Sequence, residues 1–205
     1  QTNKDLHHAF VLDDDTVATP TRIRSGVSMY AAAPHLDGVV LAACDVETPL
    51  TVQRLDSGGQ IAGELTLATC TVGDWPTIAT SPDGQILVAS TDGERTELTW
   101  LDETLKILTV VELEQGSTLT WPIFAEGAFY TADESGSLRR WSAPGEEERL
   151  GQLPYLPLPT GKLLSLRLAL ANDVMAISMA KQVSSSAGAH AFVVEYLDVG
   201  AVFLP

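Results

Sequence analysis

The sequence predicts an all-β protein built from repeated units, and one recurring spacing carries the prediction. Three kinds of landmark recur 46 residues apart in two successive copies, with no gap between them: Arg54-Leu55-Asp56 with Trp100-Leu101-Asp102, Asp37-Gly38 with Asp83-Gly84, and Trp75-Pro76 with Trp121-Pro122. A period of this length is typical of an array of supersecondary units, most economically the four-stranded blades of a β-propeller. We therefore expect residues 1–205 to form a single β-propeller domain with about four blades visible.

The copy from Trp75 to Gly116 shows the expected blade most clearly. Two turns with Asp and Gly, Ser81-Pro82-Asp83-Gly84 and Thr91-Asp92-Gly93-Glu94, separate short runs rich in β-branched residues. Such runs between turn residues are typical of short antiparallel strands. The four strands expected in this copy cover residues 77–80, 85–90, 96–101 and 106–113.

The other copies follow the same order, so the expected repeats are approximately 29–74, 75–120, 121–164 and 165–205. The first copy has expected strands at 39–43, 50–55 and 61–67, and the third has them at 123–125, 128–132 and 137–141. In the fourth copy, expected strands at 166–169, 174–179 and 191–198 surround a longer loop at 181–189. Its run of Ser, Ala and Gly is flexible by composition.

Both ends of the chain are expected to fall inside blades. Residues 8–13 resemble a third strand and residues 16–24 a fourth, so 8–25 is interpreted as a partial blade. The fourth copy ends after its third strand. Because an unpaired strand edge invites pairing, two interpretations stay open. Either the N-terminal strands complete the last blade and close a small ring, or the chain is part of a larger propeller that other residues or a partner chain complete.

Composition excludes some classes of partner. The net charge of -15, from 27 acidic and 12 basic residues, repels phosphate backbones, so we expect no nucleic-acid partner. No apolar run approaches the roughly 20 residues that cross a bilayer, so no membrane insertion is expected. Residues 1–8 are polar and begin with Gln1. The protein is therefore expected to be soluble, either cytoplasmic or extracytoplasmic after removal of a targeting segment.

The two cysteines, Cys44 and Cys70, form neither a C-x-x-C pair nor a zinc-binding spacing. The positions one period later are Ser90 and Gly116, so neither cysteine belongs to the repeat. We expect buried thiols, and a disulfide within one blade remains the alternative.

The hairpin from Asp133 to Ser142 resembles a WD40 blade, in which a turn with Asp and Gly precedes a strand that ends in Trp-Asp. Ser81-Pro82-Asp83-Gly84-Gln85 likewise resembles the turn between the first two WD40 strands. The resemblance covers residues 29–198 and is that of a divergent, WD40-like propeller, because the usual Gly-His dipeptide is absent. It implies a structural Asp-His-Ser/Thr-Trp network and a role in protein recognition.

We therefore expect a non-catalytic scaffold that mediates protein–protein interaction through the face bearing its inter-strand turns. The candidate binding residues are Trp75, Trp121, Asp37 and Asp83, with the acidic charge steering a protein partner. The recurrence of the two tryptophans also fits a purely structural wedge between blades. The alternative function is a propeller domain of an extracytoplasmic enzyme or solute-binding protein that holds a ligand in its central channel.

No catalytic residue, cofactor or metal site is expected. Ser178 and Lys181 have the Ser-x-x-Lys spacing of some acyl-transfer enzymes, but on a strand this spacing points the two side chains to opposite faces. Asp13-Asp14-Asp15 lacks the closing glutamate of a calcium loop, and the four histidines show no ligand spacing. Glu146-Glu147-Glu148 beside Arg139-Arg140 is interpreted as a solvated outer hairpin with local charge compensation.

Overall fold

The computed structural model describes residues 4–8, 21–45, 48–69, 76–91, 96–113, 122–133, 135–153, 162–171, 174–182 and 190–198. Within these ranges the regular structure consists of 17 strands and no helix. The prediction of an all-β protein is therefore confirmed.

Three of the sheets are four-stranded and antiparallel, with the strands in chain order, and we name them the first, second and third blades. The first blade contains β3 (Met29–His35), β4 (Gly38–Cys44), β5 (Pro49–Leu55) and β6 (Ile61–Thr69). The second contains β7 (Thr77–Thr80), β8 (Ile86–Thr91), β9 (Thr96–Leu101) and β10 (Ile107–Leu113). The third contains β11 (Ile123–Ala125), β12 (Ala128–Ala132), β13 (Ser137–Trp141) and β14 (Glu147–Gln152).

The remaining two sheets are smaller. The fourth blade has three strands, β15 (Lys162–Ala171), β16 (Val174–Gln182) and β17 (His190–Asp198). At the other end of the chain, β1 (Lys4–His8) pairs with β2 (Thr21–Val27) in a two-stranded antiparallel sheet.

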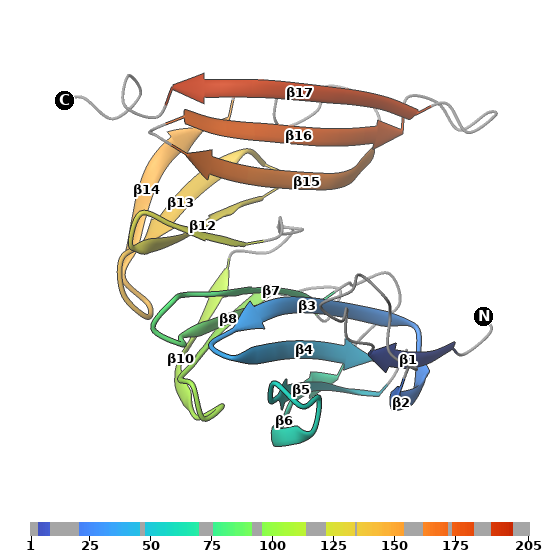
Figure 1. Cartoon of the computed structure of the whole chain (residues 1–205). Coiled ribbons are helices and arrows are strands. Elements are labelled where there is room, and N and C mark those ends of the chain that lie inside the picture. Colours follow the sequence, from blue (N-terminus) through green and yellow to red (C-terminus); the bar gives the residue numbers. More distant parts are fainter. Residues whose placement is uncertain are drawn as a thin grey trace, which may run out of the picture.

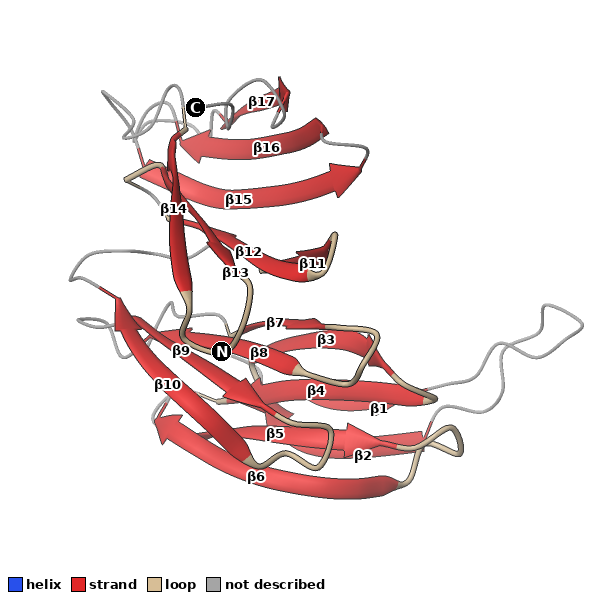
Figure 2. Ribbon diagram, turned by 90° about the vertical axis from the view of Figure 1, so that its left-hand side faces the viewer, coloured by secondary structure: helices blue, strands red, loops and turns tan. Residues whose placement is uncertain are grey.

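The sheets follow one another along an open arc, with β15–β17 at one end and the β3–β6 sheet with β1 and β2 at the other (Figures 1 and 2). A hydrophobic cluster joins each sheet to the next, since one cluster lies between the first and second blades, one between the second and third, and one between the third and fourth. A smaller cluster attaches β1 and β2 to β4. Apolar burial between successive sheets therefore holds the arc together.

Position within a blade explains the hydrophobic pattern of each strand. The central strand β8 is buried along Ile86, Leu87, Val88 and Ala89, because a neighbouring blade covers each of its faces. A strand covered on both faces is expected to show a continuous apolar run. The outermost strand β10 instead alternates between exposed and half-buried positions until Leu113, which is buried.

Most expected strands lie where the sequence places them. The strands at 77–80, 96–101, 123–125, 128–132 and 137–141 have the predicted bounds. Two strands were not predicted, β3 before the first Asp-Gly turn and β14 after the third hairpin. β14 is mostly exposed and begins Glu147-Glu148-Arg149, so it carries no hydrophobic signal of a strand. The domain and repeat boundaries themselves stay predictions.

The N-terminal strands differ from the expectation. The strand expected to start at His8 ends there, and residues 9–20 lie outside the described part of the chain. Within the described residues, β1 and β2 pair with each other and not with β15–β17. Because Leu6 and Ile23 pack against β4, the hydrophobic contact of this sheet is with the first blade. The described strands therefore do not complete the last blade.

The expected free thiol at Cys44 is wrong, because Cys44 is disulfide-bonded. Its side chain is fully buried in the cluster between the first and second blades. The chain contains one other cysteine, Cys70, which lies outside the described residues. A cross-link at this point restrains the unfolded chain and so favours the folded blade.

Candidate functional site

The candidate site lies at one end of the blades. We call the first strand of each blade its inner strand and the fourth its outer strand. The site is the end that carries the turn after each inner strand and the turn before each outer strand. We call this end the turn face. In the first blade these two turns are neighbours, because Val39 pairs with Leu55 and a Cβ on Gly38 would lie 2.0 Å from the Leu55 carbonyl oxygen. Only glycine fits at position 38 without a clash, and the equivalent Gly84 of the second blade has a φ of 88°, which favours glycine.

Hydrogen bonds between blades fix the turns to one another. The Nε2 atom of His35, at the end of β3, lies 3.0 Å from the carbonyl oxygen of Gly84 in the turn after β7. The Thr80 hydroxyl donates to the Pro34 carbonyl oxygen. At the outer turns, Arg54 donates from Nη1 to the Glu103 carbonyl oxygen at 3.0 Å. The first two blades therefore present one continuous turn surface.

The same turn chemistry recurs along this face. In the turns that start at Asp56 and Asp102, a side-chain carboxylate oxygen accepts the backbone N–H four residues later, at 2.9 Å from Gln60 and 3.0 Å from Lys106. The Ser81 hydroxyl accepts the Gln85 N–H in the same way, at 2.9 Å. Short polar side chains that bond to nearby backbone groups favour tight turns. These side chains hold the turn backbones in place.

The turn face is acidic, and hydrogen bonds lower the pKa of two of its carboxyl groups. The Ser81 hydroxyl, which bonds to Asp83, is the largest cause that lowers the pKa of this carboxyl. The Thr104 hydroxyl has the same effect on the pKa of Asp102. The described turns of this face carry the acidic residues Asp37, Asp56, Asp83, Asp102, Glu103, Glu126 and Glu146. The basic residues beside them are Arg54 and Lys106. The face therefore presents a strongly negative surface.

The structure brings two of the four predicted binding residues together. Asp37 and Asp83 are exposed and lie on the touching turns of the first and second blades. Trp75 and Trp121 lie outside the described residues. Pro76, which follows Trp75, is buried at the start of β7, whereas Asp83 follows the end of that strand. Asp83 and Pro76 therefore lie at opposite ends of β7.

Sequence reasoning missed several residues of this face. Asp102 and Glu103 follow the Trp100-Leu101 landmark, and that landmark could have placed them on an outer turn. Leu36 lies at the tip of the β3–β4 turn with φ of 48° and is 56% exposed, so it adds an apolar group to the acidic surface. No periodic signal distinguishes an exposed turn leucine from a core residue.

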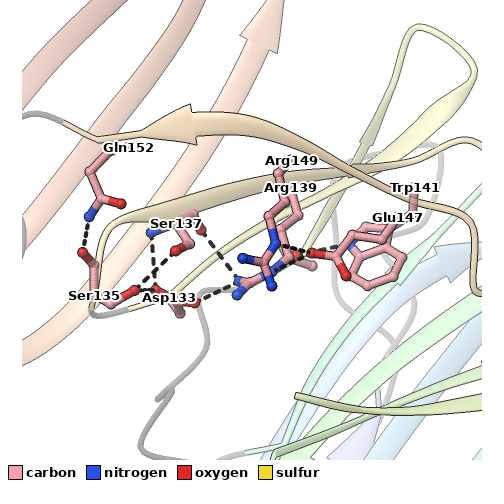
Figure 3. Close-up of polar contacts among 9 residues, drawn as sticks. Asp133, Ser135, Ser137, Arg139, Trp141, Glu147, Arg149 and Gln152 are labelled. Carbon is pink, nitrogen blue, oxygen red and sulfur yellow. Dashed lines mark hydrogen bonds and ion pairs between the residues drawn. The ribbon is translucent and has the colours of Figure 1, made fainter. Parts of the chain in front are cut away.

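A second polar cluster lies at the other end of the third blade (Figure 3). Asp133 and Arg139 form a buried ion pair with Nη1 2.6 Å from Oδ2, and Arg139 also donates from Nε to Glu147 at 3.1 Å. The second Asp133 oxygen accepts from the Ser135 hydroxyl and from the Ser137 N–H. Each charged group has its partners inside the blade, so this cluster is structural.

The expected solvated hairpin around Arg139-Arg140 is therefore only half right. Arg140 does pair with Glu148 in an exposed ion pair at 2.9 Å. Arg139, however, is 5% exposed and belongs to the buried network. The two arginines differ because successive residues of β13 point to opposite faces of the sheet.

Part of the network implied by the WD40 resemblance exists in the third blade. Trp141 donates from Nε1 to the Thr131 hydroxyl at 3.0 Å, and both side chains are buried. The acid of the turn, Asp133, pairs with an arginine where the WD40 pattern has a histidine. The third blade therefore contains a buried Thr–Trp contact together with an Asp–Arg ion pair.

The Ser-x-x-Lys spacing falls on a strand of the fourth blade. Ser178 and Lys181 lie three residues apart on β16, opposite Arg167 and Leu163 of β15, in the strand geometry that the sequence predicts. In the described part of the chain, His, Cys, Asp and Glu residues do not gather in groups of three or more that could hold a metal ion. The described ranges also hold no helix long and apolar enough to cross a membrane.

Comparison with solved structures supports the propeller architecture. A protein of unknown function from Bacteroides caccae superposes with a TM-score of 0.54 at 11% identity, over 88% of this chain and 66% of that one. BBS1N in complex with ARL6DN superposes with a TM-score of 0.53 at 12% identity, over 87% of this chain and 56% of that one. The GH43 β-1,3-galactosidase BT0265 superposes with a TM-score of 0.50 at 10% identity, over 91% of this chain and 45% of that one.

These similarities define the fold: the described sheets match parts of β-propeller structures. The chain spans less than two thirds of the length of each of these structures. No protein-family model and no curated protein sequence matches the chain. Since the matched proteins include a complex with a protein partner and an enzyme, the fold alone does not determine the function.

Proposed function

We propose that this protein is a non-catalytic β-propeller scaffold that binds a basic segment of a protein partner on its turn face. The observation that carries the proposal is the gathering of exposed and half-buried carboxylates on turns that adjoining blades hold together. Asp37 and Asp83 lie on such a pair of turns, and Asp102 and Glu103 on the outer turn to which Arg54 bonds.

Rigidity and charge both support this role. The turn backbones are fixed by the side chains of Ser81 and Asp102 and by the bond between His35 and Gly84, so binding would order few groups. A surface ordered before binding avoids part of the entropic cost of association. The depressed pKa of Asp83 and Asp102 keeps both carboxylates charged at neutral pH. Complementary charge then raises the rate of encounter and the specificity.

The experiment measures binding of the whole chain to arrayed short peptides in two matched sets, one rich in Lys and Arg and one with Glu at the same positions. We expect preferential binding to the basic set, weakened by added salt. Asp37→Asn, Asp83→Asn and Glu126→Gln together should weaken it by about tenfold or more, because they remove charge from three turns of the face.

The matched control removes three charges elsewhere. Glu97→Gln, Glu112→Gln and Glu148→Gln together change the net charge equally but lie on strands β9, β10 and β14. This variant should bind basic peptides as the natural chain does. If the two triple variants weaken binding equally, binding reflects net charge and the proposed site is wrong. If neither peptide set binds, the scaffold proposal fails at this face.

A further inference from the structure

The inner strand of the first blade, β3, has one buried face and one face that no described strand covers. Its positions Met29, Ala31 and Ala33 are buried against the second blade. The alternate positions Tyr30, Ala32 and Pro34 are exposed, and Tyr30 is 49% exposed. Val39 of β4 pairs with Pro34 in the register of the hairpin and is 39% exposed. We call Tyr30, Ala32, Pro34 and Val39 the open strip.

The next inner strand shows what a covered inner strand looks like. Successive residues Thr77, Ile78 and Ala79 of β7 are at most 7% exposed, although they point to alternate faces. β7 contacts two other inner strands, β3 and β11. Two neighbouring inner strands therefore bury both faces of the strand between them, and β3 has one such neighbour among the described strands.

The N-terminal sheet covers a different part of the same face. Leu6 of β1 and Ile23 of β2 pack against Leu41 and Ala43 of β4, which are at most 4% exposed. Leu41 pairs with Ala32, and Ala43 with Tyr30, so the covered and open residues are direct cross-strand neighbours. The N-terminal sheet therefore covers this face of the first blade at β4 but not at β3. The open strip lies directly beside that buried interface.

We propose that the open strip is the binding site for a β-hairpin of a partner protein. This hairpin has small apolar side chains at alternating positions and a basic residue that lies beside Asp37. Strands cover the equivalent positions of the next blade. Asp37 is exposed at the turn where the strip ends, which favours a cation there. The charge of -15 disfavours a second copy of this chain.

The experiment uses two cyclic hairpin peptides and the whole chain. Both peptides copy residues 29–44 with Cys44→Ser, because Met29, Ala31 and Ala33 of this hairpin are the residues that cover the next blade. One peptide keeps Asp37 and the other carries Asp37→Lys. We expect saturable binding of the Lys form, measured by titration calorimetry, at least about fivefold tighter than that of the Asp form.

Two variants of the chain locate the binding. Tyr30→Asp with Ala32→Asp should weaken binding of the Lys peptide by about tenfold or more, and the milder Tyr30→Ser should weaken it by less. Ile61→Asp with Ile107→Asp is the control, because these residues are exposed on the outer strands β6 and β10. Since all these positions are exposed, circular dichroism and thermal unfolding should show folded protein in each case.

Three results would overturn the proposal. The first is the absence of saturable binding of the Lys peptide, and the second is equal binding to the natural chain and to the Tyr30→Asp, Ala32→Asp variant. The third is a sedimentation experiment in which the natural chain forms dimers that the same variant loses, which would assign the strip to a second copy. This inference shares Asp37 with the proposed function. The Tyr30→Asp, Ala32→Asp variant separates the two, because both of its residues lie on β3 and not on a turn of the turn face.

Discussion

The indole of Trp141 donates a hydrogen bond to the hydroxyl of Thr131 across 3.0 Å, inside the third blade. Its counterpart in the second blade, Trp100, is equally buried, and its ring lies 5.0 Å from that of Trp141. Trp100 Nε1 is buried without a hydrogen-bond partner among the described residues. The buried tryptophan of the third blade thus has a hydrogen-bond acceptor, whereas that of the second blade has none among the described residues.

Thr131→Val should lower the free energy of unfolding by about 1–3 kcal/mol. Valine has nearly the same shape as threonine, so the main change is the loss of the acceptor for a buried N–H group. Urea unfolding measures the effect. Thr131→Ser is the control, since it keeps the hydroxyl, and it should cost less than Thr131→Val. Equal losses in the two variants would show that side-chain volume, not the hydrogen bond, matters at this position.

Ala89→Ser should raise the free energy of unfolding by up to about 1 kcal/mol. Trp100 pairs with Leu87 as Trp141 pairs with Phe129, so Ala89 occupies the place that Thr131 has in the third blade. A serine there offers Trp100 an acceptor. A downfield shift of the Trp100 indole proton in NMR spectra would accompany the gain. Loss of stability without that shift would contradict the equivalence of the two blades.

Asp133→Ala should lower the free energy of unfolding by about 3 kcal/mol, because it leaves the buried Arg139 guanidinium without its closest carboxylate. Glu148→Ala breaks the ion pair with Arg140, whose side chain is 37% exposed, and should cost about 0.5 kcal/mol or less. Chemical denaturation of both variants tests the contrast. Similar costs would mean that burial does not distinguish the two arginines of β13.

Leu105→Gly should destabilise the protein, and Leu36→Gly should change its stability by about 0.5 kcal/mol or less. Both leucines have left-handed backbones, with φ of 68° and 48°, which glycine adopts without strain. Leu105 is 4% exposed in the cluster between the first two blades, so its removal leaves a cavity that costs about 2–3 kcal/mol. Thermal unfolding compares the two. A stabilised Leu105→Gly variant would show that strain outweighs burial.

Protonation of Asp83 in acid should lower the free energy of unfolding. Its pKa is lower in the folded chain than the ordinary 3.8, so its ionised form stabilises the fold at pH above 3.8. This contribution is lost as the pH falls below 3.8 and through the lower pKa of the folded state. Asp83→Asn should therefore show a shallower loss of stability with acid, in denaturation series below about pH 5. Parallel curves for the variant and the natural chain would contradict a role for this carboxylate.

Strands with a strong hydrophobic or turn signal were predictable from the sequence, and strands without one were not. The Asp-Gly turn at Asp83 and the apolar run after it gave the bounds of β7 and placed β8 within one residue. β14 was missed because hydrogen bonding to β13, and not burial of an apolar face, makes it a strand. β3 was missed because Ala31-Ala32-Ala33 at its centre are small residues with little preference for a strand.

The candidate site was predictable only through its turns. The 46-residue spacing placed Asp37 and Asp83 at equivalent positions, and the structure puts them on touching turns. The other two predicted binding residues, Trp75 and Trp121, lie outside the described residues, so their place on this face stays a prediction. The buried pair of Asp133 and Arg139 was not predictable, because a charged residue on a strand gives no sign of burial when its partner comes from a turn.

The most direct test of the account is a hydrogen-exchange experiment on the whole chain with and without the tightest-binding basic peptide from the array. We expect slower exchange in the turns at residues 36–38, 81–85 and 102–106, with no change in the turn at 135–137 at the other end of the third blade. Protection that centres on residues 135–137, or that is absent from 81–85 while the peptide is bound, would contradict the proposal that the acidic turn face is the binding site.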